Sequence, residues 1–184
     1  MVQEFLERQA KMDFSYLAVG ATADIPPTGY SVDRTRIKLG DGETTFVAAK
    51  AALQRWEHFQ LGWLEVPIPE TPIKQGAVVA VLARAGGLWW ANACRIVYVV
   101  GETEHCCKFG FAYGTLPDHA ESGEERFLVE WDRKSGEVYY DILAFSRPHH
   151  ILARLVYPCV RWVQRRFRWE SAAAMLTSVN STTR

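Results

Sequence analysis

One segment of this sequence, Gly110–Glu125, concentrates the side chains that could take part in chemistry. Around a proline turn it carries Tyr113, His119, Glu121, Glu124 and Glu125. A histidine beside carboxylates can bind a metal ion or act as a general base. However, no second histidine follows at the helical spacing of four residues, and no serine or cysteine lies in a recognisable nucleophile turn. A hairpin loop whose acids cap backbone groups explains the same residues, so we assign no catalytic residue, metal site or cofactor.

Composition narrows the classes of partner. Basic and acidic residues number 21 each, so the net charge is zero and we expect no nucleic-acid partner. The apolar fraction of 48% can build a core, and we expect one domain over residues 1–184, with 1–13 as a loosely ordered N-terminal extension. No apolar run is long enough to span a membrane, and the charged start, Met1–Lys11, does not resemble a secretory signal. We therefore expect a cytoplasmic protein.

The elements that must position these residues follow from the periodicity of the apolar side chains. Alternation predicts a strand over Tyr30–Leu39, and the helical spacing of Phe46, Leu53 and Trp56 predicts a helix over Glu43–His58. Runs rich in β-branched and aromatic residues predict further strands at Leu61–Val66, Ala77–Arg84, Trp89–Val100, His105–Thr115, Glu124–Trp131 and Glu137–Phe145. The short connections between them favour antiparallel neighbours in a meander.

A long helix is predicted at the C-terminal end. Ser146-Arg147-Pro148 is typical of a helix start, with a serine N-cap and a proline in the first turn, and the helix should run to about Ala174 with a kink at Pro158. On a helical wheel, arginines gather on one face of this helix and apolar residues on the opposite face. The arginines are Arg147, Arg154, Arg161, Arg165 and Arg168, and the apolar residues are Leu152, Val156, Val160, Val163 and Phe167. Because Trp162 and Trp169 lie near the boundary, this face could attach to a membrane surface. A solvated arginine face on a core helix explains the pattern too, and the zero net charge favours it.

The predicted fold class is α+β: a curved antiparallel sheet of about six or seven strands that grips the long C-terminal helix. The strand around Phe111 predicts the curvature, because aromatic residues lie on one side of it and Gly110, Ala112 and Gly114 on the other. Glycine inside a strand indicates a bulge, a strong bend or a close neighbour.

Several motifs resemble one family. They are Phe14-Ser15-Tyr16, Val19-Gly20-Ala21-Thr22, Gly29-Tyr30, Leu39-Gly40-Asp41-Gly42, the stretch Gly110–Pro117, Gly123-Glu124-Glu125 and Phe145-Ser146-Arg147-Pro148. Between about Phe14 and Leu176 the chain resembles the domain of unknown function 1990 family, an uncharacterised protein family, and this resemblance brings no catalytic residues with it. The order of elements is similar to the helix-grip architecture of START and plant pathogenesis-related (Bet v 1-like) proteins, which bind lipids and hormones. At the level of fold alone, this likeness implies a binding function only weakly.

The leading functional hypothesis is a cavity between the sheet and the last helix that binds a small apolar molecule or lipid. Its expected lining is Trp56, Trp63, Trp90, Phe109, Phe111, Tyr113, His119, Glu121 and Tyr140, with Tyr113, His119 and Glu121 at the mouth. One alternative is an enzyme of the cyclase or hydrolase type that acts on an apolar substrate in the same cavity, with His119 as acid or base. A second alternative is peripheral membrane attachment through the arginine and tryptophan face of the last helix.

Overall fold

The computed structural model describes residues 2–85, 87–103, 107–149 and 157–182. In chain order its elements are α1 (Val2–Gln9), the 3-10 turn η1 (Ala21–Ala23), β1 (Ser31–Asp41), α2 (Gly42–Gln54), the 3-10 turn η2 (Glu57–Phe59), β2 (Leu64–Glu65), β3 (Val78–Ala85), β4 (Leu88–Val100), β5 (Lys108–Thr115), β6 (Glu121–Trp131), β7 (Glu137–Pro148) and α4 (Tyr157–Thr182). The predicted class is confirmed, because the sheet is antiparallel and the last helix is long.

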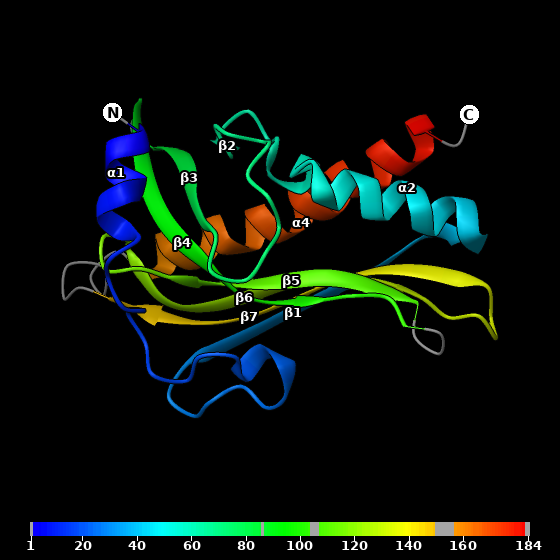
Figure 1. Cartoon of the computed structure of the whole chain (residues 1–184), viewed down its shortest axis with the longest axis horizontal. Helices are drawn as coiled ribbons and strands as arrows, with labels where there is room; N and C mark the ends of the chain where they lie inside the picture. The colour runs from blue at the N-terminus through cyan, green and yellow to red at the C-terminus, as the bar shows by residue number, and fades with distance from the viewer. Residues whose placement is uncertain (1, 86, 104–106, 150–156, 183–184) are drawn as a thin grey trace.

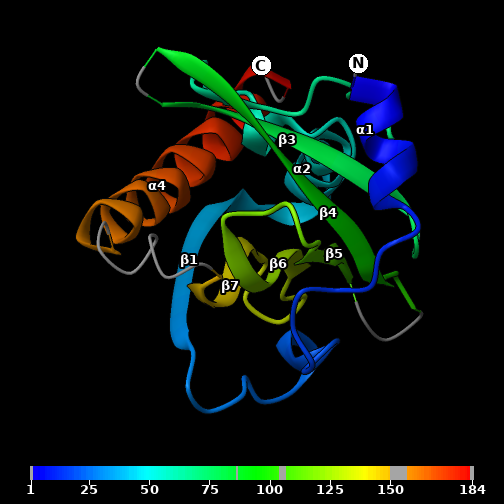
Figure 2. The same ribbon diagram turned by 90° about the vertical axis from the view of Figure 1, so that its left-hand side faces the viewer.

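The seven strands form a single curled sheet in the order β1-β7-β6-β5-β4-β3-β2. Strands β2 to β7 make the predicted meander, and β1 pairs with β7 at the far edge. Both long helices, α2 and α4, lie against the concave face, whereas the segment between α1 and β1 passes under the convex face (Figure 1). Figure 2 looks along the sheet and shows how strongly it curls. The hydrophobic core therefore lies between the concave face and the two helices.

Helix α2 ends earlier than its apolar pattern predicts. It stops at Gln54, and Trp56 adopts the left-handed region with φ of 58°, where a bulky residue is rare. Trp56 is nevertheless fully buried, and its indole nitrogen donates to the carbonyl of Thr71 at 3.0 Å. This turn sends η2 back into the core, so His58 lies in a 3-10 turn and not in the α-helix that we had predicted.

Ser146, Arg147 and Pro148 belong to β7 and do not begin a helix, so that prediction was wrong. Ser146 pairs with Ser31 of β1, and Pro148 pairs with Glu121 of β6. Strands on both sides use the backbone groups of this segment, and proline is tolerated at the end of a strand. Pairing with β1 and β6 therefore outweighs the helix-start pattern of these three residues.

Helix α4 differs from its prediction in bounds and orientation. Pro158 lies in the first turn of the helix from Tyr157, where its missing N–H is tolerated, and the helix continues to Thr182 instead of ending near Ala174. The predicted helical positions Leu152, Arg154 and Val156, and strand residue His105, lie outside the described residues. Arg161 and Arg168 turn toward the sheet, whereas Val163 is exposed. The predicted solvated arginine face was therefore wrong for these two side chains, because the sheet beneath them is polar.

The convex face explains the small residues of β5. A Cβ atom on Gly114 would lie 2.1 Å from the hydroxyl of Tyr16, so the glycine makes room for this ring. Tyr16 belongs to the segment Phe14–Asp24, which we call the strap because it crosses the convex face. The close neighbour that the glycine pattern predicted is therefore a tyrosine from the strap.

Candidate functional site

The concave face has a closed end and an open end. At the closed end the inward side chains are fully buried, among them Val138, Tyr140, Phe111 and Phe127. At the other end the inward residues Asp33, Glu121, Glu125, Ala144 and Ser146 are all partly exposed to solvent. We call these five residues, together with Tyr113, the open end. It is the end of the sheet that faces the viewer in Figure 2.

Aromatic rings fill the closed end. The ring of Trp56 contacts that of Phe111 at 4.9 Å between centroids, and His58 lies 4.7 Å from Phe127. Phe59 packs between the sheet and α4, with its ring centroid 5.1 Å from that of Phe167. Turn η2 thus inserts a plug of side chains beneath the helices. Trp56, Phe111 and Tyr140, which we predicted to line a cavity, contact one another or these rings.

The open end begins where the aromatic rings stop. Tyr113, Glu125, Ala144 and Asp33 form one row across four neighbouring strands, since each is paired with the next. The hydroxyl of Tyr113 donates to Oε2 of Glu125 at 3.0 Å. Withdrawal from water raises the pKa of Glu125 to about 7, and the bond from Tyr113 offsets only part of this. Glu125 therefore exchanges its proton near neutral pH.

Helix α4 contributes a second polar layer to the open end. Arg161 donates to Oδ1 of Asp33 at 2.7 Å, and Arg168 lies 3.0 Å from the same oxygen. Burial alone would raise the pKa of Asp33, but these two guanidinium groups outweigh it and lower that pKa. Gln164 donates to both Glu121 and Ser146. Both arginines are thus engaged by Asp33, and Glu125 has the tyrosine as its described hydrogen-bond partner.

His119 and Glu121 are neighbours, but not as an acid–base pair. Nδ1 of His119 accepts a hydrogen bond of 3.0 Å from the backbone N–H of Glu121. Burial lowers the pKa of His119 to about 4, so the ring is neutral at pH 7. Burial also raises the pKa of Glu121, partly offset by Gln164. The histidine shapes the turn before β6.

The two remaining predicted tryptophans are not part of the aromatic plug, although Trp63 packs against the edge of the core. The indole nitrogen of Trp63 donates to Glu170 of α4, and the guanidinium of Arg166 stacks 4.6 Å from the centre of its ring. Trp90 is exposed on the β3–β4 hairpin, where it pairs with Ala83. Neither residue touches the row from Tyr113 to Asp33 through a described contact.

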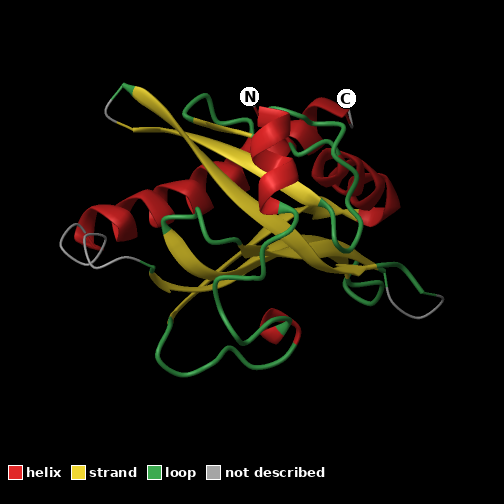
Figure 3. Ribbon diagram, turned by 60° about the vertical axis from the view of Figure 1, so that its left-hand side comes forward, coloured by secondary structure: helices red, strands yellow, loops and turns green. Residues whose placement is uncertain are grey.

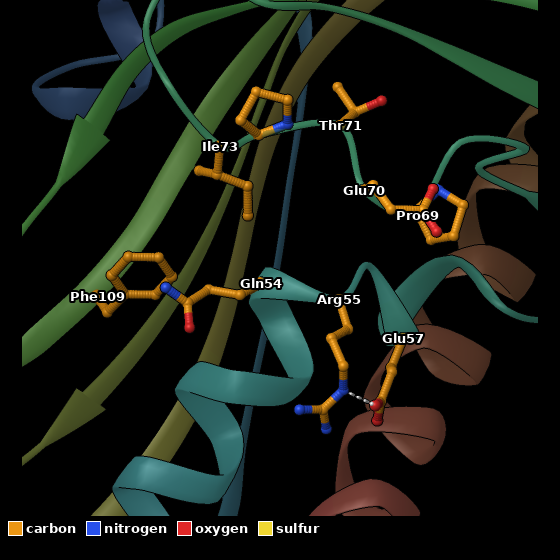
Figure 4. A pocket seen from close by; sticks show the side chains of 9 residues that line it. Gln54, Arg55, Glu57, Pro69, Glu70, Thr71, Ile73 and Phe109 are labelled. Atoms are coloured by element: carbon orange, nitrogen blue, oxygen red, sulfur yellow. Dashed lines mark hydrogen bonds and ion pairs between the residues drawn. The ribbon is translucent and has the colours of Figure 1, made fainter.

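A separate groove of about 700 Å³ opens on the outside of the molecule. It lies between the end of α2 and the loop Pro69–Ile73, and Phe109 lies on one side of it (Figure 4). Its rim carries Arg55 and Glu57, which form an ion pair at 2.6 Å. Of the residues that we predicted to bind a ligand, only Phe109 lines this groove.

Sequence reasoning missed the contributions of Asp33, Phe59 and Phe167 to the site, and it named Glu125 as a candidate for chemistry without placing it in the cavity lining. A signal for Glu125 was present, because the alternation that turns Phe127 and Val129 inward continues to Glu125. No such signal exists for Phe59, since its position follows from the left-handed turn at Trp56. Among the described residues, no group of three or more histidine, cysteine or acidic side chains could hold a metal ion.

The reverse side of β6 carries a different carboxylate. Glu124 points to the convex face, where its oxygens accept hydrogen bonds from the Tyr16 hydroxyl at 2.6 Å, from the Gly20 N–H at 2.7 Å, and from both the N–H and the hydroxyl of Thr22. Glu124 is buried and anchors the strap. Its role is therefore structural, although it is the immediate neighbour of Glu125.

Solved structures with the same arrangement place the chain in a fold class. An aromatase/cyclase from a Streptomyces species, Zhui, superposes with a TM-score of 0.55 at 10% identity, covering 84% of this chain and 96% of that chain. The protein Ara h 8.0201 gives a TM-score of 0.51 at 13% identity, with 83% and 99% covered. A norcoclaurine synthase from Thalictrum, solved with a transition-state analogue, gives 0.51 at 9% identity, with 86% and 99% covered. The chain has a helix-grip fold.

Sequence comparison then gives the family. The family described as "Domain of unknown function (DUF1990)" matches residues 15–174. A UPF0548 protein from Dictyostelium discoideum is 36% identical over 98% of this chain and 92% of its own length. A second UPF0548 protein, from Deinococcus radiodurans, is 37% identical over 90% of this chain and 87% of its own length. The chain belongs to the DUF1990 (UPF0548) family, as its motifs predicted.

Proposed function

We propose that this protein binds a small, mainly apolar organic molecule at the open end, between the sheet and the N-terminal half of α4. The observation that carries the proposal is the Tyr113–Glu125 pair. This pair faces the concave side of the sheet, and Glu125 is partly exposed to solvent. The two nearby arginines, Arg161 and Arg168, already form ion pairs with Asp33. A partly buried carboxylate without a cation of its own is costly, and such groups cluster at functional sites.

The surroundings of this pair favour one orientation of the ligand. Phe59 and Phe167 mark the apolar side, where a ring or a short chain would pack. Glu125 would accept a hydrogen bond from a hydroxyl or amino group at the other end of the molecule. The ligand would therefore be apolar over most of its surface, with one hydrogen-bond donor. Solved structures of the same fold include an aromatase/cyclase and a norcoclaurine synthase with a transition-state analogue, and they support the proposal that this fold can hold a small organic molecule.

The pKa of Glu125 favours a second candidate function, an enzyme on an apolar substrate. A carboxyl group with a pKa of about 7 can accept and return a proton at neutral pH. Glu125 would be the acid–base residue, with Tyr113 as its hydrogen-bond donor. His119 fits this role less well, because its Nδ1 accepts a hydrogen bond from the backbone and its pKa lies near 4.

The cytoplasmic location expected from the sequence stays a prediction.

Two measurements test the binding proposal. The first is solvent extraction of the purified protein followed by mass spectrometry, which should release an apolar compound. The second compares the binding of 2-naphthol and of naphthalene, which differ by one hydroxyl donor. At pH 8, where Glu125 is ionised, we expect Glu125→Gln to weaken 2-naphthol binding about tenfold, because a hydrogen bond to a charged acceptor is lost, and to leave naphthalene unchanged.

The control variant is Glu57→Gln, which removes a carboxylate from the rim of the outer groove. It should bind both probes as the wild type does. Loss of binding in Glu57→Gln but not in Glu125→Gln would place the ligand in the groove instead. Absence of both a copurifying compound and any probe binding would reject the proposal.

A further inference from the structure

The outer side of α4 carries a stripe of large apolar side chains that nothing in the described structure covers. Trp162, Trp169 and Leu176 follow one another at intervals of seven residues, so they lie on one side of the helix. They are 59%, 65% and 37% exposed. An exposed row of this kind is unusual on a monomer and marks an interaction surface.

A second group of exposed apolar residues lies at the same end of the molecule. Leu88, Trp89 and Trp90 begin β4 at the β3–β4 hairpin and are 64%, 46% and 58% exposed. The hairpin and the N-terminal half of α4 share one end of the molecule in each of three views (Figures 1, 2 and 3). Trp63 connects them, because its carbonyl accepts from the N–H of Arg84 on β3 and its ring contacts Arg166 on α4.

The charge of this surface is positive although the whole chain is neutral. Of the four arginines of α4, Arg161 and Arg168 face the sheet, and Arg166 forms an ion pair with Glu170 at 2.7 Å, so Arg165 and Arg84 supply the uncompensated positive charge. Arg165 is exposed beside the stripe, and Arg166 lies 5.8 Å from the ring centre of Trp162. On the hairpin, Arg84 is exposed. Indole rings prefer the interface between hydrocarbon and water, and guanidinium groups bind lipid phosphates.

From these observations we propose that the exposed stripe of α4 and the β3–β4 hairpin form a docking surface for an anionic lipid bilayer. The tryptophans enter the headgroup region, and Arg165 and Arg84 contact lipid phosphates. No helix in the described part of the chain is long and apolar enough to cross a bilayer, so the contact is peripheral. This attachment goes beyond ligand binding and is carried by other residues. It also differs from the attachment expected from the sequence, because Arg161 and Arg168 face the sheet.

Sedimentation of the full chain with lipid vesicles tests the proposal. One set of vesicles is pure phosphatidylcholine, and the other contains phosphatidylserine as well. We expect stronger binding to the anionic vesicles, and weaker binding as salt is added. The double variant Trp162→Ala/Trp169→Ala should lower the partition coefficient about tenfold, because two rings no longer enter the interface. Arg165→Gln should lower it about fivefold on anionic vesicles, because one positive charge is lost.

The matched control is Leu17→Ala/Ile25→Ala. These side chains are 96% and 78% exposed but lie between α1 and β1, away from α4. Binding should be unchanged in this variant. The proposal is overturned if the wild type does not sediment with either vesicle, or if the control loses as much binding as the tryptophan variant. It is also overturned if analytical ultracentrifugation shows a dimer that the tryptophan variant dissociates, because a second copy would then cover the stripe. The Glu125→Gln variant should still sediment, which separates this result from the ligand proposal.

Discussion

His58 lies inside the aromatic plug, and neither of its ring nitrogens has a hydrogen-bond partner. Burial lowers its pKa from 6.5 to about 3, so the folded protein holds the ring neutral. Between these two values the unfolded chain binds a proton that the folded chain does not. The free energy of unfolding must therefore fall as pH falls below 6.5, by up to about 1.4 kcal/mol per pH unit.

Substitution of this histidine gives a clear prediction. His58→Phe removes two unsatisfied polar atoms and keeps an aromatic ring, so the variant should be at least as stable as the wild type at pH 7. It should also lose part of the acid sensitivity. Urea unfolding at several pH values between 4 and 8 measures both effects. A variant whose stability falls with acid as steeply as that of the wild type would contradict the assignment, since His119 would then be the main cause.

Glu125 should show the opposite dependence on pH. Its pKa is raised from 4.5 to about 7, so the folded protein holds a proton that the unfolded chain has lost. Its contribution to stability is complete below pH 4.5 and is lost as pH rises through 7. Glu125→Gln should therefore stabilise the protein relative to the wild type at pH 8 and not at pH 4.5. An NMR titration of the carboxyl carbon with a midpoint near 4.5 would disprove this.

At the scale of elements, one carboxylate accepts four of the hydrogen bonds that hold the strap. Glu124→Ala would leave the Tyr16 hydroxyl and the N–H groups of Gly20 and Thr22 without their acceptor. Each unsatisfied buried group costs about 1–3 kcal/mol, so we expect a loss of about 3 kcal/mol or more. Hydrogen exchange should accelerate in the strap first. Tyr16→Phe removes one donor only and should cost about 1 kcal/mol. Equal protection of the strap in Glu124→Ala and wild type would contradict this role.

The sequence predicted most elements but fewer of their limits. The alternation of apolar residues found β1, and runs of β-branched and aromatic residues found β2 to β7. Such patterns failed for Ser146-Arg147-Pro148, where pairing with β1 and β6 outweighs a helix-start signal. They also could not predict the turn at Trp56, because a left-handed tryptophan contradicts local preference. Local propensity therefore decided the interiors of elements, and distant partners decided their ends.

At the scale of the whole molecule, α4 is fixed in two different ways. Its C-terminal half packs through Met175 and Val179, which are fully buried. Its N-terminal half is attached to β1 by the ion pairs of Asp33 with Arg161 and Arg168, and Phe167 is the buried apolar side chain of this half. Polar attachment is weaker than apolar packing, because ion pairs lose hydration when they form. The helix should therefore open from its N-terminal half.

Asp33→Asn tests this difference between the two halves. The substitution weakens both ion pairs, so amide exchange should accelerate between residues 161 and 168 and stay slow between 172 and 179. Met175→Ala is the contrasting variant: it leaves a cavity in the core and should lower overall stability by about 2–5 kcal/mol. If Asp33→Asn speeds exchange equally along the whole helix, α4 behaves as one unit and the distinction fails.

The candidate site was less predictable than the fold, because it depends on how whole layers of the molecule pack together. Which residues share a strand face can be counted along the chain, so Tyr113 and Glu121 were found. Which residues meet across layers depends on how α4 lies on the sheet. The placement of Arg168 over Asp33, and of Phe167 against Phe59, follows from that packing and has no counterpart in a single segment.

The two adjacent glutamates of β6 have a practical consequence for mutational scans. Glu124 and Glu125 are adjacent and chemically identical, yet Glu124 binds the strap on the convex face and Glu125 lies on the concave face toward the helix. A scan that treats them as interchangeable would average a folding defect with a binding defect. Deleting either one would shift every later residue of the strand to the opposite side. Homologues should therefore tolerate insertions in the turns that flank β6, and not between these two positions.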